Sequence, residues 1–300
     1  MIIHTENLHK TYGRHPALRG LNLTVPVGSA YALIGTNGAG KSTTIRTLMN
    51  IIEPSSGSAT VLGVDSRQLS PRQLAQIGYV ADGQEMPGRM KVGQYLDYLR
   101  PFYPSWDRDL EHSLVKELKL PLEHRIRALS HGMRTKLGLA CALPFRPKLL
   151  VLDEPLSGLD PLVRDELMER LLSQADEMTI FISSQELTDI EGTVTHVGFL
   201  EQGRLLFQES MSELSARMRE VRITLSDPAV SPQTAPAEWL DVRANGNVLV
   251  FVDTRFTQDR LNAAIASLLR GVRNIDVQPM ALRSIFTTLA RTSHARESGT

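Results

Sequence analysis

The segment from Gly35 to Thr43 constrains this chain more than any other stretch, because it is glycine-rich and lies between a strand-like and a helix-like run. The apolar residues 30–34 precede it and residues 44–49 follow it. Such a loop points successive backbone N–H groups at one anion, and the helix N-terminus adds partial positive charge. The pattern predicts a nucleotide phosphate loop, in which Lys41 reaches the β- and γ-phosphates and Ser42 ligates Mg²⁺. The predicted binding residues are Gly35, Thr36, Asn37, Gly38, Ala39, Gly40, Lys41, Ser42 and Thr43.

A second run, residues 149–152, ends in the two carboxylates Asp153 and Glu154. Its uninterrupted apolar residues are typical of a central parallel strand. In a nucleotide hydrolase, Asp153 would hold Mg²⁺, directly or through water, and Glu154 would orient or deprotonate the attacking water. Strands often end in acidic residues, so this pair alone is weak evidence for a hydrolase. The phosphate loop in the same chain makes that interpretation strong.

Composition restricts the classes of protein that fit. Three hundred residues suit two domains. Lys plus Arg equals Asp plus Glu at 33 each, which argues against a large nucleic-acid-binding face. The single Cys141 forms no internal disulfide, fits a reducing cytosol, and lies among apolar residues that predict a buried, inert thiol. We expect neither a signal peptide nor a membrane-spanning run, so any membrane role would need a partner.

The chain reads as an α/β domain over residues 1–211, with parallel strands and an inserted helical subdomain at about 90–143. The subdomain holds a group of aromatic residues, which indicates either a helical core or a partner-docking surface. Both readings can hold if some of the rings are exposed. The group consists of Tyr95, Tyr98, Phe102, Tyr103 and Trp106.

Residues 212–300 read as a small α+β accessory domain without a catalytic motif. Strands are expected at 221–225 and 248–252 around a loop rich in proline and alanine. Helices are expected at 261–269 and 282–290.

The motifs resemble those of the ATP-binding-cassette (ABC) ATPases, and the resemblance covers about residues 2–211. One segment is similar to the family's LSGGQ signature, another to its D-loop, and Tyr12 has the place of an aromatic that stacks on adenine. The signature segment and residues 102–107 look like those of bacterial exporter-type subunits with an extra C-terminal domain. The signature residues are Leu129, Ser130, His131, Gly132 and Met133, and the D-loop residues are Ser157, Gly158, Leu159 and Asp160.

The resemblance implies a mechanism and partners. Two cassettes would pair head to tail as a homodimer or heterodimer, with Mg²⁺ and ATP between one phosphate loop and the other's signature. Ser130 alone reads as a helix N-cap, but in the family it would grip the γ-phosphate across the interface. Integral-membrane subunits would convert the movement into transport, which the resemblance implies is export. The chain would lie at the cytoplasmic face of the membrane. No nucleic-acid partner is expected.

Two positions depart from the family pattern. Gln185 stands where the family has a switch histidine, and glutamine can hydrogen-bond a phosphate oxygen but carries no charge near neutral pH. Asp82 aligns with the family's Q-loop glutamine, and Gln84 follows two residues later, so both are candidates for the metal or its water.

Three other readings stay open. The chain could be a hydrolysis-impaired partner in a heterodimer, with Gln185 as its mark. It could be a soluble ABC protein acting on ribosomes or DNA, although it has neither a second cassette nor a coiled-coil insertion. The C-terminal domain could be a regulatory or dimerisation module that senses a ligand.

Overall fold

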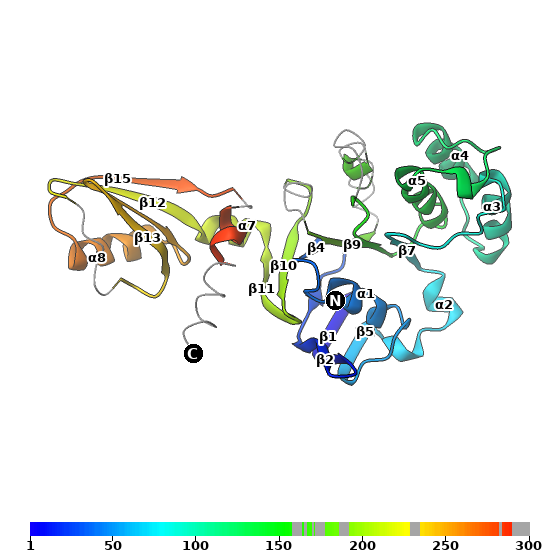
Figure 1. Ribbon diagram of the computed structural model, residues 1–300, viewed down its shortest axis with the longest axis horizontal. Coiled ribbons are helices and arrows are strands. Elements are labelled where there is room, and N and C mark those ends of the chain that lie inside the picture. Colours follow the sequence, from blue (N-terminus) through cyan, green and yellow to red (C-terminus); the bar gives the residue numbers. More distant parts are fainter. Residues whose placement is uncertain are drawn as a thin grey trace. The chain divides into compact units, whose positions relative to one another are not determined.

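The computed structural model divides the chain into two compact units, Met1–Gln208 and Glu209–Thr300 (Figure 1). It describes residues 1–157, 164, 167–169, 171, 178–185, 192–228, 235–281 and 284–289. Among these residues, no helix has the length and apolar character needed to cross a membrane.

A six-stranded sheet in the order β11-β10-β4-β9-β8-β7 forms the centre of the first unit. The pairs β10/β4, β4/β9, β9/β8 and β8/β7 are all parallel. Every residue of β4, β8 and β9 is buried, as expected for parallel strands covered on both faces. β10 and β11 are neighbours in this order and form a hairpin around residue 202. The strands are β4 (Ala30–Ile34), β7 (Ile77–Ala81), β8 (Leu149–Asp153), β9 (Thr179–Ser184), β10 (His196–Glu201) and β11 (Arg204–Ser210).

A separate antiparallel sheet precedes and follows β4 in sequence, which the expectation of an alternating parallel α/β domain missed. β1 pairs with β2, β3 and β5, and β5 pairs with β6. The hydrophobic pattern of a strand does not show which other strand it pairs with or whether the pair is parallel. The sequence therefore did not distinguish the strands of this second sheet from those of the central sheet. Its strands are β1 (Ile3–Tyr12), β2 (His15–Leu21), β3 (Thr24–Val25), β5 (Ser56–Val61) and β6 (Val64–Asp65).

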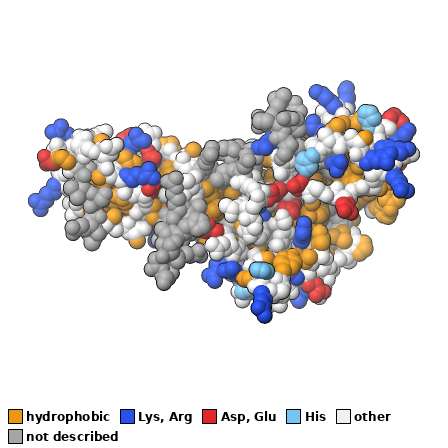
Figure 2. Space-filling view, in the orientation of Figure 1, with side chains coloured by type: hydrophobic (Ala, Val, Ile, Leu, Met, Phe, Trp, Pro, Cys, Tyr) orange, Lys and Arg blue, Asp and Glu red, His pale blue; other side chains and the backbone are white. Residues whose placement is uncertain are grey.

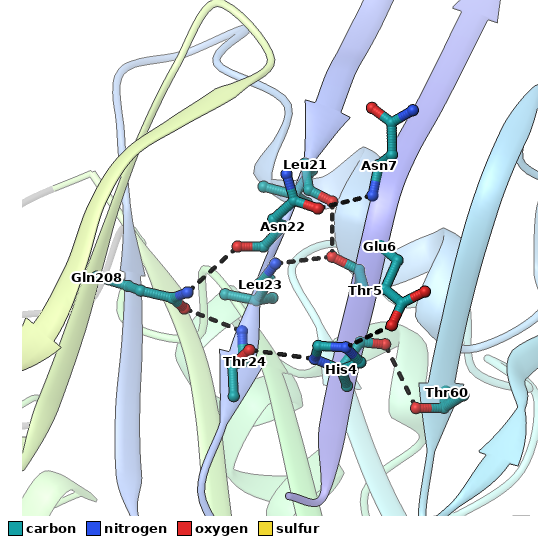
Figure 3. Close-up of polar contacts among 10 residues, drawn as sticks. All are labelled: His4, Thr5, Glu6, Asn7, Leu21, Asn22, Leu23, Thr24, Thr60 and Gln208. Carbon is teal, nitrogen blue, oxygen red and sulfur yellow. Dashed lines mark hydrogen bonds and ion pairs between the residues drawn. The ribbon is translucent and has the colours of Figure 1, made fainter.

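Gln208, the last residue of the first unit, ties β11 to this antiparallel sheet (Figure 3). Its Oε1 accepts a hydrogen bond from the Thr24 backbone N at 2.9 Å, and its Nε2 donates to the Asn22 carbonyl at 3.2 Å. Beside them the buried Thr5 hydroxyl donates to the Leu21 carbonyl at 2.8 Å. One amide side chain therefore satisfies both a donor and an acceptor of the segment that leads into β3.

The predicted helical subdomain is present between β7 and β8. These two strands are sheet neighbours, so the insertion leaves the central sheet continuous. Its helices are α3 (Val92–Leu99), α4 (Arg108–Glu117) and α5 (His131–Ala142). Outside it, α1 (Lys41–Leu48) follows the phosphate loop, and α2 (Pro71–Leu74) begins after the N-cap residue Ser70.

The aromatic residues of the subdomain divide into two groups. The Tyr103 ring stacks on Phe145 with centroids 4.1 Å apart, and the Trp106 Nε1 donates to Glu111. By contrast, Tyr98 and Phe102 contact each other edge to face and are 56% and 60% exposed. Tyr103 and Trp106 therefore fit the interpretation of a helical core, while Tyr98 and Phe102 lie on the surface.

The second unit is a four-stranded antiparallel sheet in the order β13-β14-β12-β15, packed against α8. The strands expected at 221–225 and 248–252 and the helix at 261–269 are present, but β13 and β15 were not predicted. Residues 284–289 are helical, while 282, 283 and 290 of the predicted last helix lie outside the described residues. The elements are α7 (Met211–Arg217), β12 (Arg219–Leu225), β13 (Trp239–Asn245), β14 (Val248–Asp253), α8 (Gln258–Leu268) and β15 (Val272–Pro279).

Candidate functional site

Strand register brings the predicted motifs to one edge of the central sheet. Ala81 is the partner of Asp153, Asp153 is the partner of Ser183, and Ile34 is the partner of Ser184. Parallel strands of equal register end side by side, so the segments that follow them meet in a common crevice. The segments after β4, β7, β8 and β9 therefore lie together.

The phosphate loop curls around the side chain of Lys41. Its Nζ donates to the carbonyls of Gly35 at 2.7 Å and Thr36 at 3.2 Å. Gly40 precedes α1 with φ 110°, a left-handed conformation that favours glycine. A Cβ on Gly35 would lie 2.3 Å from the Leu200 carbonyl oxygen, so no larger residue fits there. The loop thus leads directly into the N-terminus of α1, which supplies free N–H groups to an anion.

Glu154 connects this loop to the end of β9. Its Oε1 lies 3.1 Å from the Lys41 Nζ, and its Oε2 accepts a hydrogen bond from the Gln185 side-chain amide. The Lys41 side chain is only 3% exposed, so this ion pair is shielded from water. Glu154 itself has φ 49°, an uncommon conformation for a residue with a side chain. The structure brings Lys41, Glu154 and Gln185 into direct contact.

Asp153 accepts two hydroxyl hydrogen bonds on the same oxygen, from Ser42 at 3.1 Å and from Ser183 at 2.8 Å. Burial raises the pKa of the Asp153 carboxyl, and these hydrogen bonds oppose that effect. Ser183 also accepts from the Glu154 backbone N at 2.9 Å, so it orients both acidic residues. Sequence reasoning missed Ser183 as a site residue. A polar residue at the carboxyl end of the apolar run 179–182 was the available signal.

The oxygens of Ser42 and Asp153 form a donor set that fits Mg²⁺, which favours carboxylate, hydroxyl and phosphate oxygens. The other two metal candidates point elsewhere. The Asp82 carboxylate lies 3.2 Å from the His131 Nε2, and the Gln84 Oε1 accepts from the Ala81 backbone N at 3.5 Å. Across the described part of the chain, no three His, Cys, Asp or Glu residues are close enough to form a metal site without other ligands.

Figure 2 shows acidic side chains gathered on the surface over the ends of β7 and β9. The Asp82 side chain is 43% exposed, and its backbone N donates to the Asp153 carbonyl at 2.9 Å. An acidic surface beside a phosphate loop disfavours binding of a metal-free nucleotide and favours binding of a nucleotide complexed with a divalent cation.

The signature residues lie at the start of α5. Ser130 is the N-cap, and its hydroxyl accepts a hydrogen bond from the Met133 backbone N at 3.3 Å. Leu129 is buried, while the His131 side chain is 44% exposed. The Gly132 backbone lies in the first turn, where N–H groups have no intrahelical partner. This helix start therefore has the hydroxyl and backbone donors that a phosphate requires.

Two further predicted elements are the adenine-stacking aromatic and the D-loop. Tyr12 ends β1, is 46% exposed, and has the Lys10 Nζ 5.2 Å from its ring centroid. Ser157 donates its backbone N–H to the Glu154 carbonyl at 3.1 Å. The remaining D-loop positions Gly158, Leu159 and Asp160 lie outside the described residues.

Comparison with known proteins gives consistent matches. Residues 18–157 match the family model described as ABC transporter. The chain is 34% identical to the bacitracin transport ATP-binding protein BcrA of Bacillus licheniformis, over 75% of this chain and 76% of that protein. It is also 34% identical to the lantibiotic transport ATP-binding protein SrtF of Streptococcus pyogenes, over 68% of this chain and 89% of that protein. A solved bacterial ABC transporter cassette, described as dimeric, shares the fold with a TM-score of 0.63 at 21% identity, covering 70% of this chain and 98% of that one.

Proposed function

This chain belongs to the ATP-binding proteins of the ABC transporter family, and on that premise we propose that it powers an exporter by hydrolysing Mg²⁺-ATP between two head-to-tail cassettes. It is an ABC ATPase, and ATP hydrolysis drives transport. One observation carries the proposal for the chemistry, namely that Lys41, Ser42, Asp153, Glu154 and Gln185 converge at the carboxyl ends of β4, β8 and β9.

Each side chain of the site has a separate role in the transfer of the γ-phosphoryl group to water. Lys41 and the N–H groups of residues 36–43 bind the phosphate oxygens and stabilise their charge. Ser42 and Asp153 would hold Mg²⁺, which would supply positive charge to the bound phosphates. Glu154 orients the attacking water and accepts its proton, while Ser183 fixes the backbone from which that carboxylate projects.

Gln185 serves as a neutral positioning group in place of the family's histidine. Its amide already donates to Glu154, so it can hold the carboxylate in place and bind a phosphate oxygen or water with the same side chain. This contact supports a working site. The absence of a charge supports the second candidate, an ATP-binding partner with impaired hydrolysis in a heterodimer.

The dimer and its partners extend the proposal. Ser130 and the first N–H groups of α5 would bind the γ-phosphate held by the opposite cassette, so ATP closes the dimer and hydrolysis releases it. Tyr12 would stack on adenine, and residues 157–160 would lie at the dimer interface. We place the chain at the membrane through integral-membrane subunits, with the exposed Tyr98 and Phe102 as part of their docking surface. The two relatives are named for bacitracin and lantibiotic transport, which favours cargo of that kind.

The test is Mg²⁺-dependent ATP hydrolysis by the purified chain. Glu154→Gln keeps the size of the side chain and removes its basicity, and Glu53→Gln is a matched control at an exposed position. We expect turnover that Glu154→Gln lowers by roughly a hundredfold or more, while ATP binding is retained. Binding without turnover by the native chain would favour the impaired partner. Adding a catalytically complete cassette or the membrane subunits then separates an inactive site from one that requires docking.

A further inference from the structure

The side chain of His131 lies where three motif segments meet. Its Nε2 is 3.0 Å from the Ser157 carbonyl oxygen and 3.2 Å from the Asp82 Oδ1. Both partners are acceptors, so this nitrogen carries a proton and donates to both. His131 is the first residue of α5, Asp82 follows β7, and Ser157 follows the two catalytic carboxylates. The family signature has glycine at this position, so the contact depends on the histidine of this chain.

Both acceptors are bound in turn to the residues that perform the chemistry. The Asp82 backbone N donates to the Asp153 carbonyl at 2.9 Å, and the Ser157 backbone N donates to the Glu154 carbonyl at 3.1 Å. His131 is therefore linked to the backbone of Asp153 through Asp82 and to the backbone of Glu154 through Ser157.

Close packing holds α5 in register on β7. A Cβ on Gly138 would lie 2.9 Å from Val80 Cγ1, and a Cβ on Gly78 would lie 3.0 Å from the Ala142 carbonyl oxygen. The two elements run in opposite directions, and three contacts follow one another along them. These contacts join Ala142 to Gly78, Gly138 to Val80, and His131 to Asp82. We call this row of contacts the α5–β7 seam. Because its two glycines leave no room for sliding, His131 marks the end of a rigid unit.

We propose that His131 is a positioning residue that couples the γ-phosphate side of its own ATP site to the signature serine presented to the other site. This inference rests on the proposed function. Through Asp82 and Ser157, the position of Asp153 and Glu154 fixes the first turn of α5, where Ser130 is the N-cap. Removal of the imidazole leaves the phosphate loop intact and frees the helix start, so the grip on the opposite nucleotide weakens.

The experiment compares His131→Ala, His131→Gln, Asp82→Ala and the double variant His131→Ala/Asp82→Ala. His112→Ala is the control, because this histidine is exposed on α4. For each protein we would measure kcat, KM, binding of a fluorescent ATP analogue to the monomer, and ATP-dependent dimerisation in the Glu154→Gln background.

We expect His131→Ala to lower kcat and the association constant of the ATP-dependent dimer by roughly tenfold each. The affinity of the monomer for ATP should change by less than about twofold. Glutamine has two amide hydrogens, one for each acceptor, so His131→Gln should recover most of the loss. The double variant should be no worse than the more affected single variant, because both remove one interaction.

Distinct results overturn the inference. Normal kcat and dimerisation in His131→Ala, or strictly additive losses in the double variant, would show that the contact transmits nothing. Parallel losses of monomer ATP binding and melting temperature would assign His131 a purely structural role. A native chain that neither hydrolyses ATP nor dimerises would instead overturn the proposed function, and the inference with it.

Discussion

Replacing Glu111 by alanine tests how a buried carboxylate organises the helical subdomain. The Glu111 side chain is 3% exposed and receives hydrogen bonds from Arg100 Nε at 2.7 Å, Arg100 Nη2 at 2.5 Å and Trp106 Nε1 at 2.7 Å. Removing one partner of a buried ion pair leaves the other without compensation, which costs about 3–5 kcal/mol. Arg100 keeps its ion pair with the exposed Asp97, so we expect the lower end, about 3 kcal/mol.

The matched control is Glu123→Ala, which breaks an exposed ion pair. Glu123 lies 2.7 Å from the Lys91 Nζ, and the two side chains are 84% and 46% exposed. Such exposed pairs contribute little to stability, because water and salt screen them. In a unit of this size, 1 kcal/mol shifts the melting temperature by about 2–4 °C. Calorimetry should therefore show a loss of roughly 6–12 °C for Glu111→Ala and less than about 4 °C for Glu123→Ala.

The pH dependence of this difference gives a second check. Burial alone would raise the pKa of Glu111, but the hydrogen bonds from Arg100 and Trp106 outweigh it and hold the pKa below its ordinary value. The stabilisation is therefore complete above the pKa of the unfolded carboxyl and is lost as pH falls through the lowered pKa. Equal losses for Glu111→Ala and Glu123→Ala at pH 7, or a difference that grows on acidification, would refute the reasoning.

Three further predictions concern Asp153, Cys141 and Gln208. Because burial raises the Asp153 pKa, the stability of the nucleotide-free protein should fall as pH rises from the ordinary carboxyl pKa through the raised one. Asp153→Asn should remove this slope and raise the melting temperature at pH 7, while abolishing hydrolysis. Burial also raises the pKa of the Cys141 thiol, so at pH 8 a thiol reagent should label the native protein at least about tenfold more slowly than the urea-unfolded chain. Gln208→Ala removes the acceptor of the Thr24 backbone N–H, so the free energy of unfolding should fall by about 1–3 kcal/mol and hydrogen exchange at that amide should become faster. Unchanged exchange would mean that another group accepts this hydrogen bond.

The sequence was sufficient where chemistry and local structure coincide. The glycines, Lys41 and Ser42 follow a buried run directly, so the loop between β4 and α1 could be predicted, and phosphate binding by its residues stays a prediction. The same holds for Asp153 and Glu154 at the end of β8. In each case the residues that carry the chemistry are neighbours in the chain, and the strand before them has an unambiguous pattern.

Prediction failed where the information is non-local. β13 and β15 have mixed polar residues and no strong alternation, and their pairing with β14 and β12 supplies most of their stability. Ser183 becomes a site residue only because β9 lies beside β8 in register. The Asp82 side chain seemed free to approach the metal until α5 placed His131 next to it. None of these relations is encoded within a short window of sequence.

The α5–β7 seam has a consequence for how related chains can diverge. Gly138 gives the space that Val80 fills, and Gly78 gives the space at Ala142. A larger residue at Gly138 needs a smaller one at position 80, whereas a larger residue at Gly78 would meet the Ala142 backbone carbonyl, which no substitution removes. Positions 80 and 138 should therefore change together along lineages. A gene library that randomises Val80 and Gly138 jointly would then return small–large pairs in both orders, and almost no large–large pairs.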